Sequence, residues 1–109
     1  MELSLNDLKD LVGSKNETIA PKRHPFCIGK DYLIRTVTMT LTGKLIDVFE
    51  TELVLENAAW IADTGRFSKS LVSCEFEEVE IFPVDKTVVV GRGALIDAVI
   101  IDKLPTETK

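Results

Sequence analysis

The sequence has few of the residues on which reactive and metal-binding sites depend. It contains two cysteines, Cys27 and Cys74, and one histidine, His24. Two cysteines so far apart, with no CxxC spacing, predict buried free thiols. Three soft ligands are too few for a structural zinc site unless a carboxylate joins them. His24 has no obvious carboxylate to orient it, and no GxxxxGK or HExxH motif occurs. We therefore expect no enzyme activity, no metal and no cofactor.

Long apolar runs and an excess of positive charge are also missing. No apolar stretch is long enough to span a membrane, and Met1–Ser4 lacks the cationic start of a signal peptide. We therefore expect a cytoplasmic protein without a membrane partner. The net charge of −5 argues against a protein that binds bulk nucleic-acid phosphate, although it leaves room for a local basic pocket.

The composition is that of an ordinary globular domain, and we expect residues 1–109 to form one domain. Hydrophobic residues make up 45% of the chain and charged residues 28%. Ser4 suits a helix N-cap, leucines at helical spacing follow, and Gly13 suits the end, so residues 4–13 predict a short N-terminal α-helix. The connector 14–30 contains Lys22-Arg23-His24, which is either a solvated loop or a phosphate-facing arm.

From Tyr32 onward the apolar residues alternate with a period of two, which indicates strands. Turn residues between these runs delimit strands at 32–42, 44–49, 53–62, 74–82, 88–90 and 94–101. Residues 67–73 fit neither pattern. Many short strands with brief turns predict a mainly β fold, a small SH3-like bent antiparallel barrel over residues 31–103 with a polar tail at 104–109.

The most informative segment is Gly91-Arg92-Gly93, which separates the last two apolar runs. Glycine allows either a sharp bend or the close approach of another group. Arginine presents a rigid fork of donors that suits a phosphate, a carboxylate or a base edge. Arg92 and Gly93 therefore predict a binding site.

Two further groups of residues are candidates for the same ligand. Trp60, the single tryptophan, is either a platform on which a planar ring stacks or a core residue. The segment Asp63-Thr64-Gly65-Arg66 offers an acceptor, a hydroxyl, a free backbone and a guanidinium, or is a plain turn with a surface arginine.

Arg35 and Thr38 lie on the first predicted strand. Arg35 shares a face with Leu33 by strand parity, so it pairs with an acid such as Asp97 or faces a ligand. Thr38 belongs to a hydroxyl-bearing face that is either solvent-exposed or the polar wall of a pocket. The predicted site is thus the set Arg35, Thr38, Trp60, Asp63, Thr64, Gly65, Arg66, Arg92 and Gly93.

The segments Leu53-Val54-Leu55-Glu56-Asn57 and Val88–Ile96 resemble the Sm-like family. That resemblance covers roughly residues 32–101 and implies an N-terminal helix, five bent strands and assembly into a ring, hence a homo-oligomer. In that family an Asp-x-x-x-Asn loop helps to bind uridine, whereas the turn Phe49-Glu50-Thr51-Glu52 is shorter and lacks the Asn. The residues 60–75 also enlarge the link between two strands.

The chain also resembles small phage-encoded proteins that carry runs like Ala59–Phe67 and Gly91–Ala94. This implies a counter-defence protein that sequesters a small nucleotide signal, a cyclic oligonucleotide or an ADP-ribose derivative. Trp60 would stack the base, Arg66 and Arg92 would hold phosphates, and Asp63 and Thr64 would read ribose or base edges. The alternatives are an Sm-like single-stranded RNA-binding protein and an acidic inhibitor that binds a nucleic-acid enzyme through Glu75–Glu80.

Overall fold

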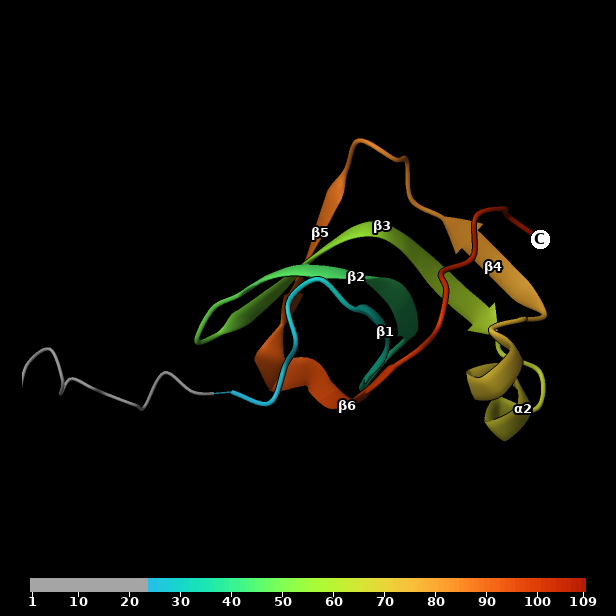
Figure 1. The fold of residues 1–109 in the computed structure, drawn as a ribbon, viewed down its shortest axis with the longest axis horizontal. Coiled ribbons are helices and arrows are strands. Elements are labelled where there is room, and N and C mark those ends of the chain that lie inside the picture. The colour runs from blue at the N-terminus through green and yellow to red at the C-terminus, as the bar shows by residue number, and fades with distance from the viewer. Residues whose placement is uncertain (1–23) are drawn as a thin grey trace, which may run out of the picture.

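The computed structural model describes residues 24–109 as a strongly bent antiparallel sheet with two short helices (Figure 1). The predicted helix 4–13 and most of the predicted connector lie outside these residues. The elements are β1 (Asp31–Thr36), β2 (Thr40–Val48), β3 (Glu52–Asp63), α2 (Phe67–Ser73), β4 (Glu78–Ile81), β5 (Thr87–Gly91), the 3-10 turn η3 (Arg92–Ala94) and β6 (Leu95–Ile100).

The long strand β3 organises the sheet. Its first half pairs with β5 and its second half with β4, while β2 lies along its other edge. β1 then joins β2 to β6, so the order is β4-β3-β2-β1-β6 with β5 beside β3. In Figure 1, β3 bends in its middle, and β4 and β5 lie toward its opposite ends. This bend wraps the sheet around one of its faces.

The predicted strand 32–42 is wrong, because Val37–Met39 form a turn between two separate strands. The hydroxyl oxygen of Thr36 accepts a hydrogen bond from the Met39 amide (3.1 Å), and the Thr36 amide donates to the Met39 carbonyl (2.8 Å). β-branched and apolar residues continue through this turn, so alternation alone does not reveal it. Thr38 therefore lies in the turn and not on a strand face.

Two other predicted boundaries also change. Gly43 lies inside β2 and does not end a strand, and a Cβ there would stand only 3.0 Å from the Cβ of Leu55. The glycine therefore permits the close crossing that bends the sheet. The predicted strand 74–82 is shortened to β4, and the preceding residues 67–73 form α2.

The sheet has a hydrophobic core on each face. Core 1 fills the inside of the bend, and its buried members include Ile34, Leu45, Leu53, Leu55 and Val90. Core 2 lies on the opposite face, where Leu33, Ala59, Ile61, Phe76 and Val79 pack beneath α2 and the C-terminal segment. Both faces of β1 are buried, so the prediction of a strand with one apolar face and one polar face is wrong for β1.

The C-terminal tail covers the outer edge of β4. Lys109 exchanges two backbone hydrogen bonds with Val79 (2.8 and 2.9 Å), and the Thr108 hydroxyl oxygen accepts one from the Ile81 amide (3.2 Å). Leu104 packs against core 2. Within residues 24–109, no strand pairs with the outer edge of β5 or of β6. The same residues include no helix long and apolar enough to cross a membrane.

Candidate functional site

Arg35 is engaged by residues of its own chain. Its Nε and Nη2 donate to the two carboxylate oxygens of Asp97 at 2.9 and 2.5 Å, and its guanidinium lies 4.7 Å from the centre of the Phe67 ring. The pairing with Asp97 was one of the two sequence expectations. Although Leu33 shares this face and is fully buried, the side chains of Arg35 and Asp97 are 42% and 49% exposed. Arg35 thus ties β1 to β6 and to the first residue of α2.

This ion pair shifts both titrations. Hydrogen bonding to Arg35 is the main cause that lowers the pKa of Asp97 below its ordinary value. The same hydrogen bonds and the carboxylate charge raise the pKa of Arg35. Both groups therefore stay charged at neutral pH.

The segment Asp63–Arg66 forms a turn that is closed by its own hydrogen bonds. The Asp63 carboxylate accepts from the Gly65 amide (2.8 Å), and the Thr64 hydroxyl donates to the Gly65 carbonyl (2.8 Å). Gly65 has φ of +73°, which favours glycine. These contacts are those of a plain turn, and Arg66 follows at the start of α2. A role of these four residues toward a ligand stays a prediction.

Trp60 is neither fully buried nor isolated. It lies on β3 between Ala59 and Ile61, which point into core 2, so its ring projects from the core 1 face. The side chain is 41% exposed. It borders a hollow of about 250 Å³ whose other walls come from the β1–β2 turn and the end of β4, namely Met39, Glu80, Ile81, Phe82 and Pro83. The hollow has the flat apolar wall that a planar ring requires.

Arg92 is held in one place by contacts with two other segments. Its amide donates to the Thr51 carbonyl (2.9 Å) and its Nη1 to the Phe49 carbonyl (2.6 Å), so the side chain joins the β2–β3 turn to η3. The guanidinium also lies 5.3 Å from the centre of the Phe26 ring. Arginine has five N–H donors, and within residues 24–109 only one of those on Arg92 has a hydrogen-bond partner, so the others are available to a ligand.

The glycines beside Arg92 do not serve the bend itself. Gly91 has φ of −70°, and Gly93 is not among the described residues with positive φ. A Cβ added at either position would meet nothing within 4 Å. Glycine was expected here to permit either a sharp bend or the close approach of another group. The backbone of the chain does not require glycine for the bend, and the open space fits the approach of a group from outside the chain.

The predicted site residues separate onto the two faces of the sheet. Trp60 and Arg92 border core 1, since Phe82 next to the tryptophan and Phe26 next to the arginine both pack against that core. Arg35 lies on the core 2 face, because Leu33 has the same parity on β1 and Phe67 packs against core 2. The structure therefore does not gather Arg35 and Trp60 on one face.

Sequence reasoning missed several residues that lie beside Trp60 or Arg92, among them Phe26, Met39 and Glu80. Phe26 had no strand pattern to place it, Glu80 was read as part of an acidic ribbon, and Met39 was assigned to a strand. The proximity of Glu80 to Trp60 is revealed only by the pairing of β3 with β4, which puts the two residues opposite each other.

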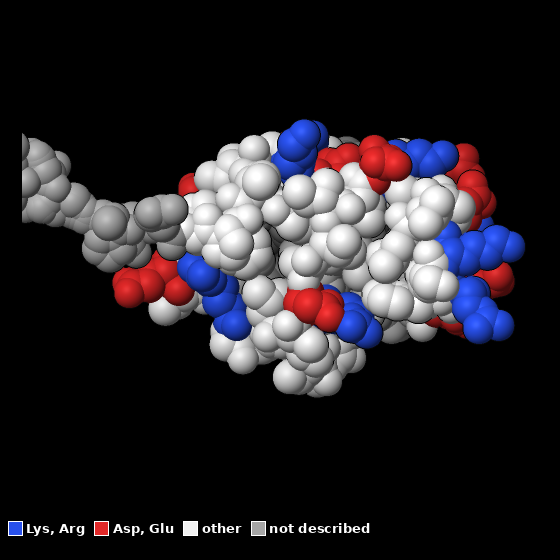
Figure 2. All heavy atoms as spheres, turned by 60° about the horizontal axis from the view of Figure 1, so that its bottom comes forward, with Lys and Arg blue, Asp and Glu red and all other residues white. Residues whose placement is uncertain are grey.

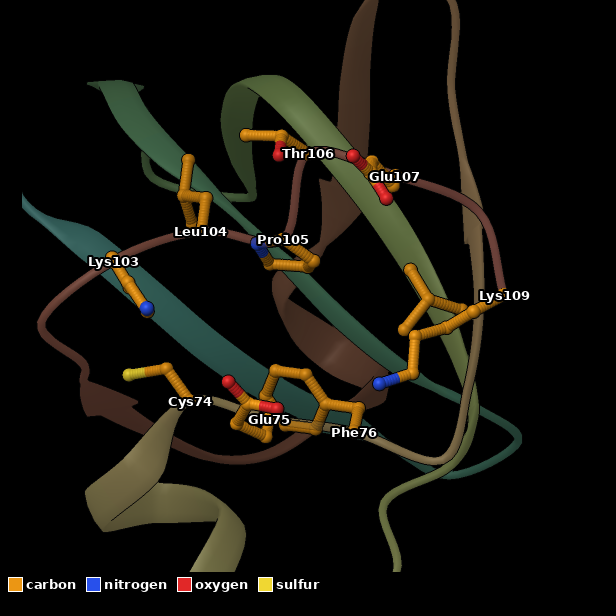
Figure 3. A pocket seen from close by; sticks show the side chains of 10 residues that line it. Cys74, Glu75, Phe76, Lys103, Leu104, Pro105, Thr106, Glu107 and Lys109 are labelled. Atoms are coloured by element: carbon orange, nitrogen blue, oxygen red, sulfur yellow. The ribbon is translucent and has the colours of Figure 1, made fainter.

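The hollow in Figure 3, about 370 Å³, lies beneath the tail and has a mixed lining that includes Glu75, Lys103, Glu107 and Lys109. In the part of the chain that the structure describes, no cluster of His, Cys, Asp or Glu is arranged to hold a metal ion. On the face shown in Figure 2, side chains of both charges intermingle around a broad uncharged area, with no continuous basic stripe.

A structural comparison identifies the fold. The chain is similar to the crystal structure of a heptameric archaeal Sm protein, with a TM-score of 0.50 and 21% identity over 69% of this chain and 90% of that one. The fold is Sm-like. A scan against protein-family models and a search of curated proteins found no match. The predicted mainly β, Sm-like architecture is therefore confirmed for the described residues.

Proposed function

We propose that this protein is a non-enzymatic binder that sequesters a small nucleotide on the rim of core 1, by which we mean the surface beside core 1 that carries Trp60 and Arg92. The observation that supports the proposal best is Arg92, a preorganised guanidinium beside a backbone that lacks side chains. Exposed Trp60 borders the same core and supplies a stacking surface. A phosphate and a base are the two groups that such residues suit.

The contacts of Trp60 and Arg92 set a lower limit on the ligand's size. Each charge-assisted hydrogen bond contributes about 1.5–3 kcal/mol, and a base stacked on an aromatic ring about 1–3 kcal/mol. Two such hydrogen bonds and one stacked base give roughly 4–9 kcal/mol before association costs are subtracted. A Kd of 1 μM requires about 8.2 kcal/mol after that subtraction, so a micromolar ligand must make further contacts.

The spacing favours a ligand with several nucleotide units. Gly91 pairs with Glu52, eight residues before Trp60 on β3, which is roughly 26 Å along the strand and a shorter direct distance because β3 bends between them (Figure 1). A cyclic oligonucleotide extends further than one nucleotide and therefore suits this spacing better than an ADP-ribose derivative does.

We also propose that the protein forms a homo-oligomer. The uncovered edge strands carry exposed apolar side chains, with Val89 on β5 at 62%, and Ile96 and Ile100 on β6 at 61% and 47%. Edge-to-edge pairing would cover the free backbone groups and these side chains together. The similar archaeal Sm protein is a heptamer, which supports a ring.

The resemblance to small phage-encoded proteins supports a counter-defence role in the cytoplasm of a host cell. Sequestration needs binding and no reaction, so the proposal includes no catalytic step.

Single-stranded RNA is the second candidate ligand. It is favoured by the contact of Arg92 with the Phe49 carbonyl, which brings the β2–β3 turn against the Gly-Arg-Gly turn. The net charge of −5 weighs against it, because RNA binding depends on many phosphate contacts.

A thermal-shift panel tests the proposal. Purified protein is melted with cyclic oligonucleotides, ADP-ribose derivatives and short RNAs. A ligand at a hundred times its Kd stabilises the fold by about 2.7 kcal/mol, or several degrees for a chain of this size. A shift with one small nucleotide supports the proposal. A shift with RNA alone moves the assignment to the second candidate, and a flat panel contradicts both and directs attention to a protein target.

A further inference from the structure

We infer that Glu80 makes the Trp60 hollow a guanine subsite, an inference that rests on the proposed nucleotide binding and names the base. The hollow is defined as the space bordered by Met39, Trp60, Glu80, Ile81, Phe82 and Pro83. This hollow lies beside β4, which pairs with the second half of β3, whereas Arg92 follows β5, which pairs with the first half.

The positions of the two side chains follow from strand register. Trp60 and Glu80 are directly opposed on β3 and β4. Opposed residues on antiparallel strands project from the same face, with Cβ atoms about 5 Å apart. The carboxylate of Glu80 is thus adjacent to the indole. Phe82, which directly follows the end of β4 and whose amide donates to the Ala58 carbonyl of β3 (3.0 Å), closes one side of the hollow.

The lining suits a base and not a phosphate. No lysine or arginine borders the hollow, and its only charged group is the Glu80 carboxylate. That carboxylate is exposed and makes no ion pair or hydrogen bond with another side chain in residues 24–109. It therefore repels a phosphate and stays free to accept hydrogen bonds from a neutral ligand.

Guanine matches an ionised carboxylate better than the other common bases do. A carboxylate accepts hydrogen bonds and donates none. Guanine presents its N1–H and its 2-amino group side by side on one edge, so both carboxylate oxygens accept a bond. Adenine and cytosine place an acceptor nitrogen beside their amino group, and the single N–H of uracil lies between two carbonyl oxygens. Each of these would set an acceptor against the carboxylate.

Tryptophan fluorescence measures the inference directly, because Trp60 is the single tryptophan of the chain. We would titrate the full-length protein with GMP, IMP and UMP. These three nucleotides share the phosphate and ribose, so any phosphate contact contributes equally to their affinities. Differences in affinity therefore report the base. GMP is expected to bind about tenfold more tightly than UMP. IMP, which lacks the 2-amino group, is expected between them.

Glu80→Gln tests the carboxylate. The variant is expected to lose most of the GMP preference, to about threefold or less over UMP, while UMP affinity is kept. Glu78→Gln is the matched control, because it removes the same charge two residues away on β4 and does not border the hollow. It is expected to keep the full preference.

Two results overturn the inference: equal affinities of wild type for GMP and UMP, or a full GMP preference in Glu80→Gln. Either can occur while a nucleotide from the thermal-shift panel still stabilises the protein. In that case the guanine assignment fails and the proposed function stands. If no nucleotide changes either the fluorescence or the melting temperature, both fail.

Discussion

At the scale of single residues, charged groups in this protein hold the fold and offer binding capacity in different places. Arg35 and Arg92 each have a fixed guanidinium over an aromatic ring, yet Arg35 is neutralised by the Asp97 carboxylate, whereas Arg92 donates only to a carbonyl and has no carboxylate partner within residues 24–109. The partners of a residue therefore decide its role more than its type does.

Asp97→Asn is expected to lower the free energy of unfolding at neutral pH, because the carboxylate no longer accepts hydrogen bonds from Arg35. The pKa of Asp97 is below its ordinary 3.8. Its contribution is thus fully present above that pH and is lost as pH falls through the lower folded-state pKa. The difference between wild type and variant should shrink below about pH 3.8.

Urea unfolding at neutral and acidic pH measures this effect, with exposed Asp102→Asn as the control. The effect should be modest, because the pair is well exposed and water screens it. A constant difference across the pH range would contradict the assignment.

Thr42→Val is expected to stabilise the protein by about 1 kcal/mol. Thr42 is fully buried on β2, and its hydroxyl has no hydrogen-bond partner within residues 24–109. Valine has the same shape without a hydroxyl that must be desolvated. Chemical unfolding measures the change, and a loss of stability would show that the hydroxyl has a partner.

At the scale of elements, the sequence predicted strand-rich structure well and boundaries less well. Alternation identified the regions of β2, β3, β5 and β6, and the turn at Asp63–Arg66. It joined β1 to β2 because Val37–Met39 look like strand residues, and only hydrogen bonds of Thr36 mark that turn.

The site was predicted only in part, for a related reason. Composition and spacing identified Trp60 and the Gly-Arg-Gly turn, but they could not tell which side of a doubly buried sheet each residue faces. Arg35 was therefore grouped with Trp60, although the packing of Phe67 places it on the other face. Glu80 was missed because its position beside Trp60 depends on the register of β3 against β4, which no local sequence pattern encodes.

Removing residues 107–109 is expected to expose the outer edge of β4. Hydrogen exchange measures this, because the Val79 and Ile81 amides bond to Lys109 and Thr108 and should lose protection. The Phe82 amide is an internal control, since it donates to Ala58 of β3 (3.0 Å) and should keep its protection. Unchanged protection at Val79 would show that the tail does not cover this edge in solution.

At the scale of the whole molecule, the tail and the strand edges bear on the proposed homo-oligomer. The tail occupies the β4 edge, so the free edges are those of β5 and β6 among the described strands. A sheet with two free, apolar edges on one chain can extend from copy to copy and close on itself.

Val89→Lys is expected to break this assembly, because an ammonium group on an edge strand opposes pairing. Sedimentation velocity should give wild type a mass several times that of the 12.1 kDa chain, and the variant a mass near one chain. Val84→Lys is the control, being 80% exposed but outside any strand. A wild-type protein that sediments as one chain would contradict the proposed oligomer.

The central claim, that a nucleotide binds on the rim of core 1, is tested most directly by calorimetric titration of wild type, Arg92→Ala and Lys69→Ala. The titrant is the nucleotide that gives the largest thermal shift. Arg92→Ala should weaken binding by about 2 kcal/mol, or about thirtyfold, because charge-assisted hydrogen bonds are lost. Lys69→Ala, which removes a positive charge from the exposed face of α2 above core 2, should bind like wild type. Unchanged affinity in Arg92→Ala would contradict the claim.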